Sequence, residues 1–224
     1  NMRFDIITIF PSMFDSYLNE SIIKRAREKK LVDIRVHDLR AFTKDTHKKV
    51  DDRPFGGGPG MVLKIEPIAR VLDEILKKSK IKKLYTKIIL FSAAGEQFNA
   101  KTATQWAKKY NHIVMITGRY EGVDERIFKV CRAAGYTLQA LCIGPYVLTG
   151  GELPAMVAID AISRHISGVL GKEKSLEEMR YGVGIPMFTR PEVFTYKAKK
   201  YRVPKELLSG SHALIEEWRK EHGI

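Results

Sequence analysis

The feature that most constrains the fold of this chain is a regular alternation between short apolar runs and amphipathic segments over roughly its first 165 residues. The apolar runs, which predict strands, occupy residues 2–10, 31–39, 86–92, 112–118 and 137–144. Helical patterns lie between or after them, at residues 11–30, 67–76, 99–109, 122–133 and 151–166. Strands that alternate with helices in this way predict an α/β domain with a largely parallel sheet.

Three successive predicted strands each run into a loop that contains glycine. These loops are FSAAGEQF, ITGRYEGVDER and CIGPYVLTGGELPA. In an open parallel sheet, ligands bind beyond the carboxyl ends of the strands, where glycines let the backbone approach a ligand closely. Ordinary turn chemistry is the alternative, but three such loops in succession favour a ligand-binding crevice.

The ligand is not expected to be a dinucleotide or a nucleoside triphosphate. No GxGxxG follows the first strand, and no GxxxxGK[ST] occurs anywhere in the chain. The glycine-rich GGGPGM has no following lysine and hydroxyl residue to hold phosphate and magnesium. Nucleotide triphosphate hydrolysis is therefore disfavoured.

The chain is strongly basic, with a formal net charge of +13 and a pI near 9.7. This charge favours a polyanionic partner, with nucleic acid ahead of an anionic membrane surface, although a generally lysine-rich composition would also produce it. No apolar run reaches the ~18 residues that a membrane span needs. Cys131 and Cys142 match no disulfide framework or zinc motif, and the histidines are scattered, so we expect a cytoplasmic protein without a bound metal.

Four motifs, in order, are specific enough to indicate a family: DDRPFGGGPGMV, GRYEGVDERI, YVLTGGELPAM and TRPEVF. With FDIITIFPSMF near the start and VPKELLSGSHALIEEWR near the end, they closely resemble bacterial tRNA (guanine-N1)-methyltransferases of the SPOUT class. The resemblance implies an α/β fold whose ligand loops form a deep trefoil knot, with a small C-terminal helical domain. It also implies S-adenosyl-L-methionine as cofactor, a homodimer with a shared active site, and methylation of N1 of guanosine 37 in tRNA, preceded by G36.

The resemblance divides the chain into three parts and assigns candidate residues. Residues 1–170 would form the knotted catalytic domain, residues 171–188 a linker that contributes to the active site, and residues 189–224 a helical domain that grips the anticodon arm. Cofactor binding is expected at Ser92, Gly95, Gly118, Tyr120, Glu121, Ile143, Gly144, Pro145, Tyr146, Val147, Leu148, Gly150, Gly151 and Pro154. The guanine pocket and RNA contacts are expected at Arg53, Gly57, Gly58, Pro59, Gly60, Met61, Arg190 and His212.

The reaction itself asks for two catalytic groups. Guanine N1 is a poor nucleophile until it loses its proton, and that loss places negative charge on O6. Arg164 matches the family's catalytic arginine and is expected to stabilise O6, although a cation that serves the helix dipole is the alternative. The family's base is an aspartate fifteen residues further on, where this chain has Met179. Glu178 is the expected base, and Glu177 and Glu173 are the alternatives.

Other departures from the family pattern are smaller. Ala93 and Ala94 stand where Pro-Gln is common, and Pro145 stands where an aspartate is common. The linker is about three residues shorter before Pro186, and about five extra residues precede Ile143 without a functional explanation. The missing aspartate leaves two other hypotheses open: an RNA-binding relative that has lost catalysis, and another SPOUT-class RNA methyltransferase that acts on a ribose hydroxyl.

Overall fold

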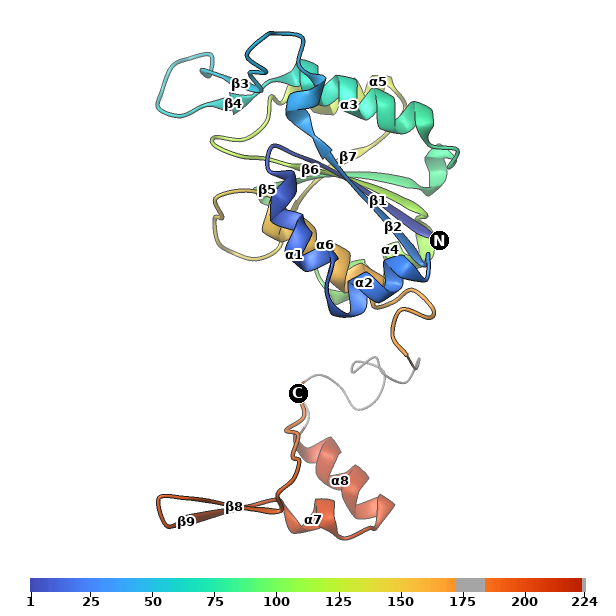
Figure 1. The fold of residues 1–224 in the computed structure, drawn as a ribbon, viewed down its shortest axis with the longest axis vertical. Coiled ribbons are helices and arrows are strands. Elements are labelled where there is room, and N and C mark those ends of the chain that lie inside the picture. The colour runs from blue at the N-terminus through green and yellow to red at the C-terminus, as the bar shows by residue number, and fades with distance from the viewer. Residues whose placement is uncertain (172–183, 223–224) are drawn as a thin grey trace. The chain divides into compact units, whose positions relative to one another are not determined.

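The computed structural model describes residues 1–171 and 184–222 (Figure 1). The chain divides into two compact units, Asn1–Leu170 and Gly171–Ile224. Glu173, Glu177 and Glu178, the three candidates for the base, lie outside the described residues.

The first unit is built on one five-stranded parallel sheet, as the sequence predicts. Its strands stand in the order β2-β1-β6-β5-β7, and every neighbouring pair is parallel. Their bounds are β1 Met2–Thr8, β2 Val32–Asp38, β5 Thr86–Gln97, β6 His112–Thr117 and β7 Leu138–Cys142. β5 runs beyond the expected residue 92 because it pairs with β7 again at Glu96 and Gln97, after a shift of register.

Helices cover both faces of this sheet (Figure 1). One face carries α1 Asp15–Leu18, α2 Ser21–Glu28, α4 Ala100–Lys109 and α6 Glu152–Ser163, and the other carries α3 Ile65–Lys78 and α5 Arg126–Ala133. The strands are apolar on both sides, so neighbouring residues of β1 enter different cores: Ile6 packs toward α6, and Ile7 toward α3. The predicted helix after residue 11 is instead a 3-10 turn followed by α1 and α2, and Ser21, the first residue of α2, has a positive φ of 50°.

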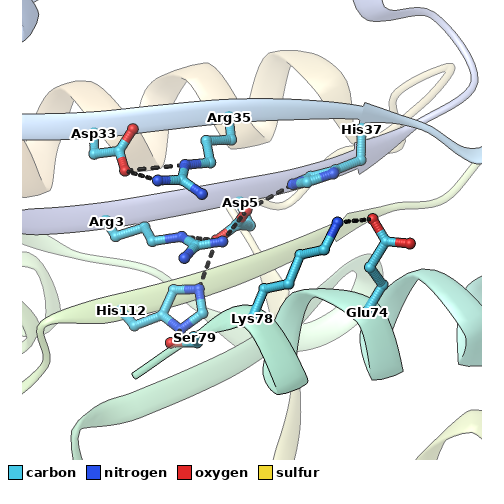
Figure 2. Close-up of polar contacts among 9 residues, drawn as sticks. All are labelled: Arg3, Asp5, Asp33, Arg35, His37, Glu74, Lys78, Ser79 and His112. Carbon is cyan, nitrogen blue, oxygen red and sulfur yellow. Dashed lines mark hydrogen bonds and ion pairs between the residues drawn. The ribbon is translucent and has the colours of Figure 1, made fainter. Parts of the chain in front are cut away.

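One buried cluster in the sheet is polar (Figure 2). Asp5 of β1 is 0% exposed, and its carboxylate accepts from Arg3 at 2.6 Å and lies 2.6 Å from Nε2 of both His37 and His112. The other ring nitrogen of His112 lies 3.2 Å from Oγ of Ser79, at the end of α3. Burial alone would raise the pKa of Asp5, but the hydrogen bonds from His112, His37 and Arg3 outweigh it and hold that pKa well below its ordinary value.

The second unit contains a β-hairpin that the sequence pattern did not predict. β8 Val193–Tyr196 and β9 Lys199–Arg202 pair antiparallel, and α7 Lys205–Leu208 and α8 His212–His222 follow. The two turn residues, Lys197 and Ala198, both have positive φ, at 46° and 63°, which is the geometry of a two-residue type I′ turn. Such turns usually contain asparagine or glycine, so this sequence carries no turn signal.

Candidate active site

A cavity of about 400 Å³ opens at the carboxyl ends of β5, β6 and β7. The crevice that the three glycine-bearing loops predict is therefore present. Its walls come from the end of β5, the loop before α5 and the loop between β7 and α6. The residues that line it are Leu90 to Ala94, Gly118 to Val123, Glu125, Leu141 to Ile143, Tyr146 to Gly151, and Pro154.

Two glycines allow the three loops to pack closely enough to form the cavity. A Cβ at Gly95 would lie 2.4 Å from the backbone nitrogen of Leu141, and one at Gly151 would lie 2.8 Å from Cα of Thr117. The backbone N–H of Gly151 donates to the carbonyl of Gly118 at 2.9 Å, and Arg119 forms an antiparallel bridge with Gly150. These contacts fix the loop after β7 directly against the end of β6.

Most of the predicted cofactor residues meet at this cavity. Those that line it are Ser92, Gly118, Tyr120, Glu121, Ile143, Tyr146, Val147, Leu148, Gly150, Gly151 and Pro154. Gly95, Gly144 and Pro145 are not among the lining residues. A Cβ at Gly144 would lie 2.4 Å from Cε1 of Tyr146, so this glycine lies directly beneath the Tyr146 ring.

A buried ion pair stabilises the cavity wall, and the sequence analysis missed it. Glu152, at the start of α6, is 1% exposed and accepts from Nε of Arg119 at 2.9 Å. Its other carboxylate oxygen accepts from the hydroxyls of Thr8, at 2.8 Å, and Thr117, at 3.2 Å. The pair thus joins the ends of β1 and β6 to α6. Both residues belong to the motifs that indicate the family. The sequence feature that could have predicted the pair is an acidic residue at the start of a mostly apolar helix.

The DRPFGGGPGM segment reaches the same cavity at one end. Glu121 donates its backbone N–H to the carbonyl of Met61 at 3.0 Å, and a Cβ at Gly60 would overlap the Glu121 side chain. The rest of the segment is exposed, with Gly57 and Gly58 at positive φ and Phe55 99% exposed. Arg53 and Phe55 line a separate groove of about 800 Å³. Gly60 and Met61 therefore adjoin the cavity, whereas Arg53, Gly57, Gly58 and Pro59 extend away from these contacts.

The remaining candidates lie elsewhere in the described chain. Arg164 is the half-buried C-cap of α6 and is not among the residues that line the cavity. Pro154, at the other end of the same helix, does line it. With a rise of 1.5 Å per residue, Arg164 stands about 15 Å along the helix from Pro154. Arg190 and His212 are exposed residues of the second unit.

Comparison with known proteins decides the family. A family model described as tRNA (Guanine-1)-methyltransferase TrmD matches residues 2–224. The chain belongs to this family. The resemblance that the motifs indicated therefore extends across the whole matched length, and not only over the glycine loops.

Curated relatives in this family include three proteins named tRNA (guanine-N(1)-)-methyltransferase. The protein from Dictyoglomus turgidum is 45% identical over 226 residues, which cover 100% of this chain and 85% of that protein. Those from Moorella thermoacetica and Clostridioides difficile are 43% and 42% identical, and each match covers 100% of this chain and 86% or 93% of the relative.

The described residues contain neither a cluster suited to a metal ion nor a helix suited to a membrane. Among residues 1–171 and 184–222, no group of three His, Cys, Asp or Glu side chains is arranged to hold a metal ion. Within the same ranges, no helix has both the length and the apolar character required to cross a membrane. The two cysteines are free, and burial raises the pKa of the Cys131 thiol to about 11.

Proposed function

We propose that this protein transfers a methyl group from S-adenosyl-L-methionine to N1 of guanosine 37 in tRNA, next to the anticodon and preceded by G36. The observation that carries the proposal is the cavity at the ends of β5, β6 and β7, in a chain that belongs to a tRNA (guanine-1)-methyltransferase family throughout. The net charge of +13 supports a polyanionic substrate, because lysine and arginine neutralise phosphates without regard to sequence.

The residues present fit S-adenosylmethionine. Tyr146, Val147 and Leu148 form a partly exposed apolar loop over the cavity, suited to a flat adenine ring whose edge meets backbone groups. The carboxylates of Glu121 and Glu125 lie on the opposite loop, where they favour a ligand with positive charge. When bound, the cofactor supplies an electrophilic methyl group on a sulfonium centre.

The chain's own groups would then prepare the guanine. Gly60 and Met61 place the DRPFGGGPGM segment beside the cavity, where it would frame the base. Arg164 would stabilise the negative charge that develops on O6 when N1 loses its proton. Glu178 would accept that proton, with Glu177 and Glu173 as the alternatives, because no aspartate follows Asp160 in the chain.

The position of Arg164 supports a homodimer with a shared active site. Arg164 does not line the cavity and stands about 15 Å along α6 from Pro154, which does, so a guanine in the same copy would have to extend beyond the cavity to meet it. Arg164 can serve the cavity of a second copy, and α6 carries an apolar outer surface suited to such a contact. On this surface Leu153 is 54% exposed and Val157 is 46% exposed, and most other residues of α6 are also apolar.

The finer architecture follows the family. Residues 1–170 would form the knotted catalytic domain, with the packed loops after β5, β6 and β7 as the trefoil knot. Residues 171–188 would complete the active site, and residues 189–224 would bind the anticodon arm, with Arg190 and His212 in contact with RNA. The protein would act in the cytoplasm.

The test is a methylation assay on wild-type protein. Labelled S-adenosylmethionine is incubated with an undermodified tRNA that carries G36 and G37, and the product nucleoside is mapped. We expect 1-methylguanosine at position 37, and no label in a transcript with another base at that position. Binding of tRNA without methyl transfer would instead identify an RNA-binding relative, and label on a ribose 2′-oxygen would identify a different SPOUT-class methyltransferase.

A further inference from the structure

The second unit exposes three aromatic rings on one face of the β8–β9 hairpin. Phe194 pairs with Tyr201 across the strands, and Tyr196 pairs with Lys199. Because side chains alternate between the faces of a strand, these four residues share one face. The rings are 55%, 53% and 55% exposed for Phe194, Tyr201 and Tyr196, and those of Phe194 and Tyr196 lie within 13° of parallel with their centroids 6.4 Å apart.

The fold of the second unit does not account for this aromatic face. The unit packs its own small core around Trp218, which is 8% exposed and contacts the rings of Phe188 and His222. The hairpin extends away from α7 and α8 (Figure 1). Aromatic residues usually stabilise a fold by being buried, and three rings that are about half exposed contribute less in this way. Their exposure therefore indicates a surface that contacts a ligand.

The charges around the face indicate what it contacts. Residues 190–202 contain five basic side chains, Arg190, Lys197, Lys199, Lys200 and Arg202, and one acidic side chain, Glu192, for a net charge of +4. Lys200 and Arg202 pair with Thr195 and Val193 and therefore lie on the opposite face of the hairpin. Lys199 belongs to the aromatic face itself, and Nζ of Lys197 lies 5.5 Å from the centre of the Tyr196 ring. Exposed rings combined with cations are the pattern that binds unpaired nucleotides, with bases stacked on the rings and phosphates held by the cations.

We propose that the aromatic face of the hairpin, formed by Phe194, Tyr196 and Tyr201, stacks unpaired bases of the RNA substrate. This inference rests on the proposed function for the identity of that RNA, which is tRNA. Stacking on rings tolerates any base, so the face contributes affinity without reading sequence. The opposite face, with Val193 and Thr195, carries no ring and takes no part in stacking.

The test compares variants that remove the rings with variants that keep them. The combined variant Phe194→Val, Tyr196→Thr and Tyr201→Val removes the rings but keeps residues that favour strands. The double variant Tyr196→Phe and Tyr201→Phe keeps every ring, and Thr195→Val alters only the opposite face. Far-UV circular dichroism and melting curves establish that each variant is folded.

Two measurements follow on the full-length protein with an unmodified tRNA transcript. Filter binding at several salt concentrations gives Kd and its salt dependence, and steady-state assays give KM for tRNA and for S-adenosylmethionine. Loss of the rings should raise Kd and KM for tRNA about 5- to 150-fold for each stacked base. The slope of log K against log salt and the KM for S-adenosylmethionine should not change, because no phosphate contact is lost. The ring-keeping variant and Thr195→Val should bind as wild type does.

The outcomes separate this inference from the proposed function. Unchanged tRNA binding by the folded ring-less variant would overturn the inference and leave the face for a protein partner. An equal loss in the ring-keeping variant would also overturn it, because the cause would then be a disturbed hairpin. A wild-type protein that transfers no methyl group contradicts the proposed function alone, since the Kd comparison tests stacking without any chemistry.

Discussion

Replacement of Asp5 with asparagine should destabilise the first unit strongly, although Asp5 lies outside the proposed active site. The carboxylate makes four short contacts, two with Arg3 at 2.6 and 3.0 Å and one with each of His37 and His112 at 2.6 Å (Figure 2). An asparagine keeps one accepting oxygen and puts an N–H₂ group in place of the other. About half of these contacts are therefore lost, and buried donors are left without an acceptor.

The size of the effect follows from burial. Each buried polar group left without its partner costs about 1–3 kcal/mol, and loss of one member of a buried ion pair costs about 3–5 kcal/mol. We therefore expect Asp5→Asn to lower the free energy of unfolding by about 4 kcal/mol, which is about 8–16 °C in Tm for a unit of this size. The measurement is thermal and urea unfolding followed by circular dichroism at pH 7.

A matched control lies on the neighbouring strand. Asp33 pairs with Arg35 at 2.7 Å, but the two side chains are 36% and 50% exposed (Figure 2). Exposed pairs contribute about 0–1 kcal/mol, so Asp33→Asn should shift Tm by only a few degrees. If Asp5→Asn proves no more damaging than Asp33→Asn, the buried cluster does not stabilise the fold as argued.

The same carboxylate predicts how stability depends on pH. The folded-state pKa of Asp5 is lowered, so its contribution to stability is present above the unfolded aspartate value of about 3.9 and is lost as the pH falls below it. The difference in unfolding free energy between wild type and Asp5→Asn should accordingly shrink as the pH falls below about 4. A difference that stays constant down to pH 2.5 would contradict the assigned direction of the shift.

Three further predictions concern the active site. Glu178→Gln should lower the methylation rate about 10²–10⁴-fold with little change in cofactor affinity, and an unchanged rate would move the role of base to Glu177 or Glu173, tested by the same substitution. Arg164→Ala and Gly144→Val should each be inactive alone, the second because the added side chain displaces the Tyr146 ring. When the two variants are co-expressed, half of the dimers should contain one copy of each and therefore one complete site of two. The mixture should then recover about a quarter of wild-type activity. Gly95→Ala should lower stability by about 1–3 kcal/mol and weaken cofactor binding measured by calorimetry, since the added Cβ meets the rigid backbone of Leu141 at 2.4 Å.

The sheet could be predicted because its physical cause is local in the sequence. Strands buried on both faces, such as HIVMIT at residues 112–117, are mostly apolar, and such runs separated by amphipathic segments leave few alternatives to a parallel α/β sheet. The positions of the ligand loops followed from the same pattern, since the carboxyl ends of parallel strands lie on one edge. Their glycines are required by backbone contacts, as Gly95 and Gly151 show.

What the sequence did not predict depends on contacts between distant residues or on unusual backbone. The β8–β9 hairpin turns at Lys197 and Ala198, which rarely adopt positive φ, so no residue pattern marks the turn. The contacts from Glu152 to Thr8 and Thr117 join residues 144 and 35 positions apart, a distance at which periodicity carries no information. A buried acid at a helix start is visible in the sequence, but its partners are not.

The location of Arg164 bears on how the active site is assembled. The resemblance to the family assigns Arg164 and the cavity residues to one active site, whereas Arg164 does not line the cavity and stands at the opposite end of α6 from Pro154. The assignment and the observed separation agree if the active site is formed between two copies of the chain. The exposed apolar residues Leu153 and Val157 lie on α6, between Arg164 and the cavity, where they could contact a second copy. Substitution of Glu173, Glu177 and Glu178 by glutamine, one at a time, decides in the methylation assay which of them serves as the base, because only loss of the base should lower the rate about 10²–10⁴-fold.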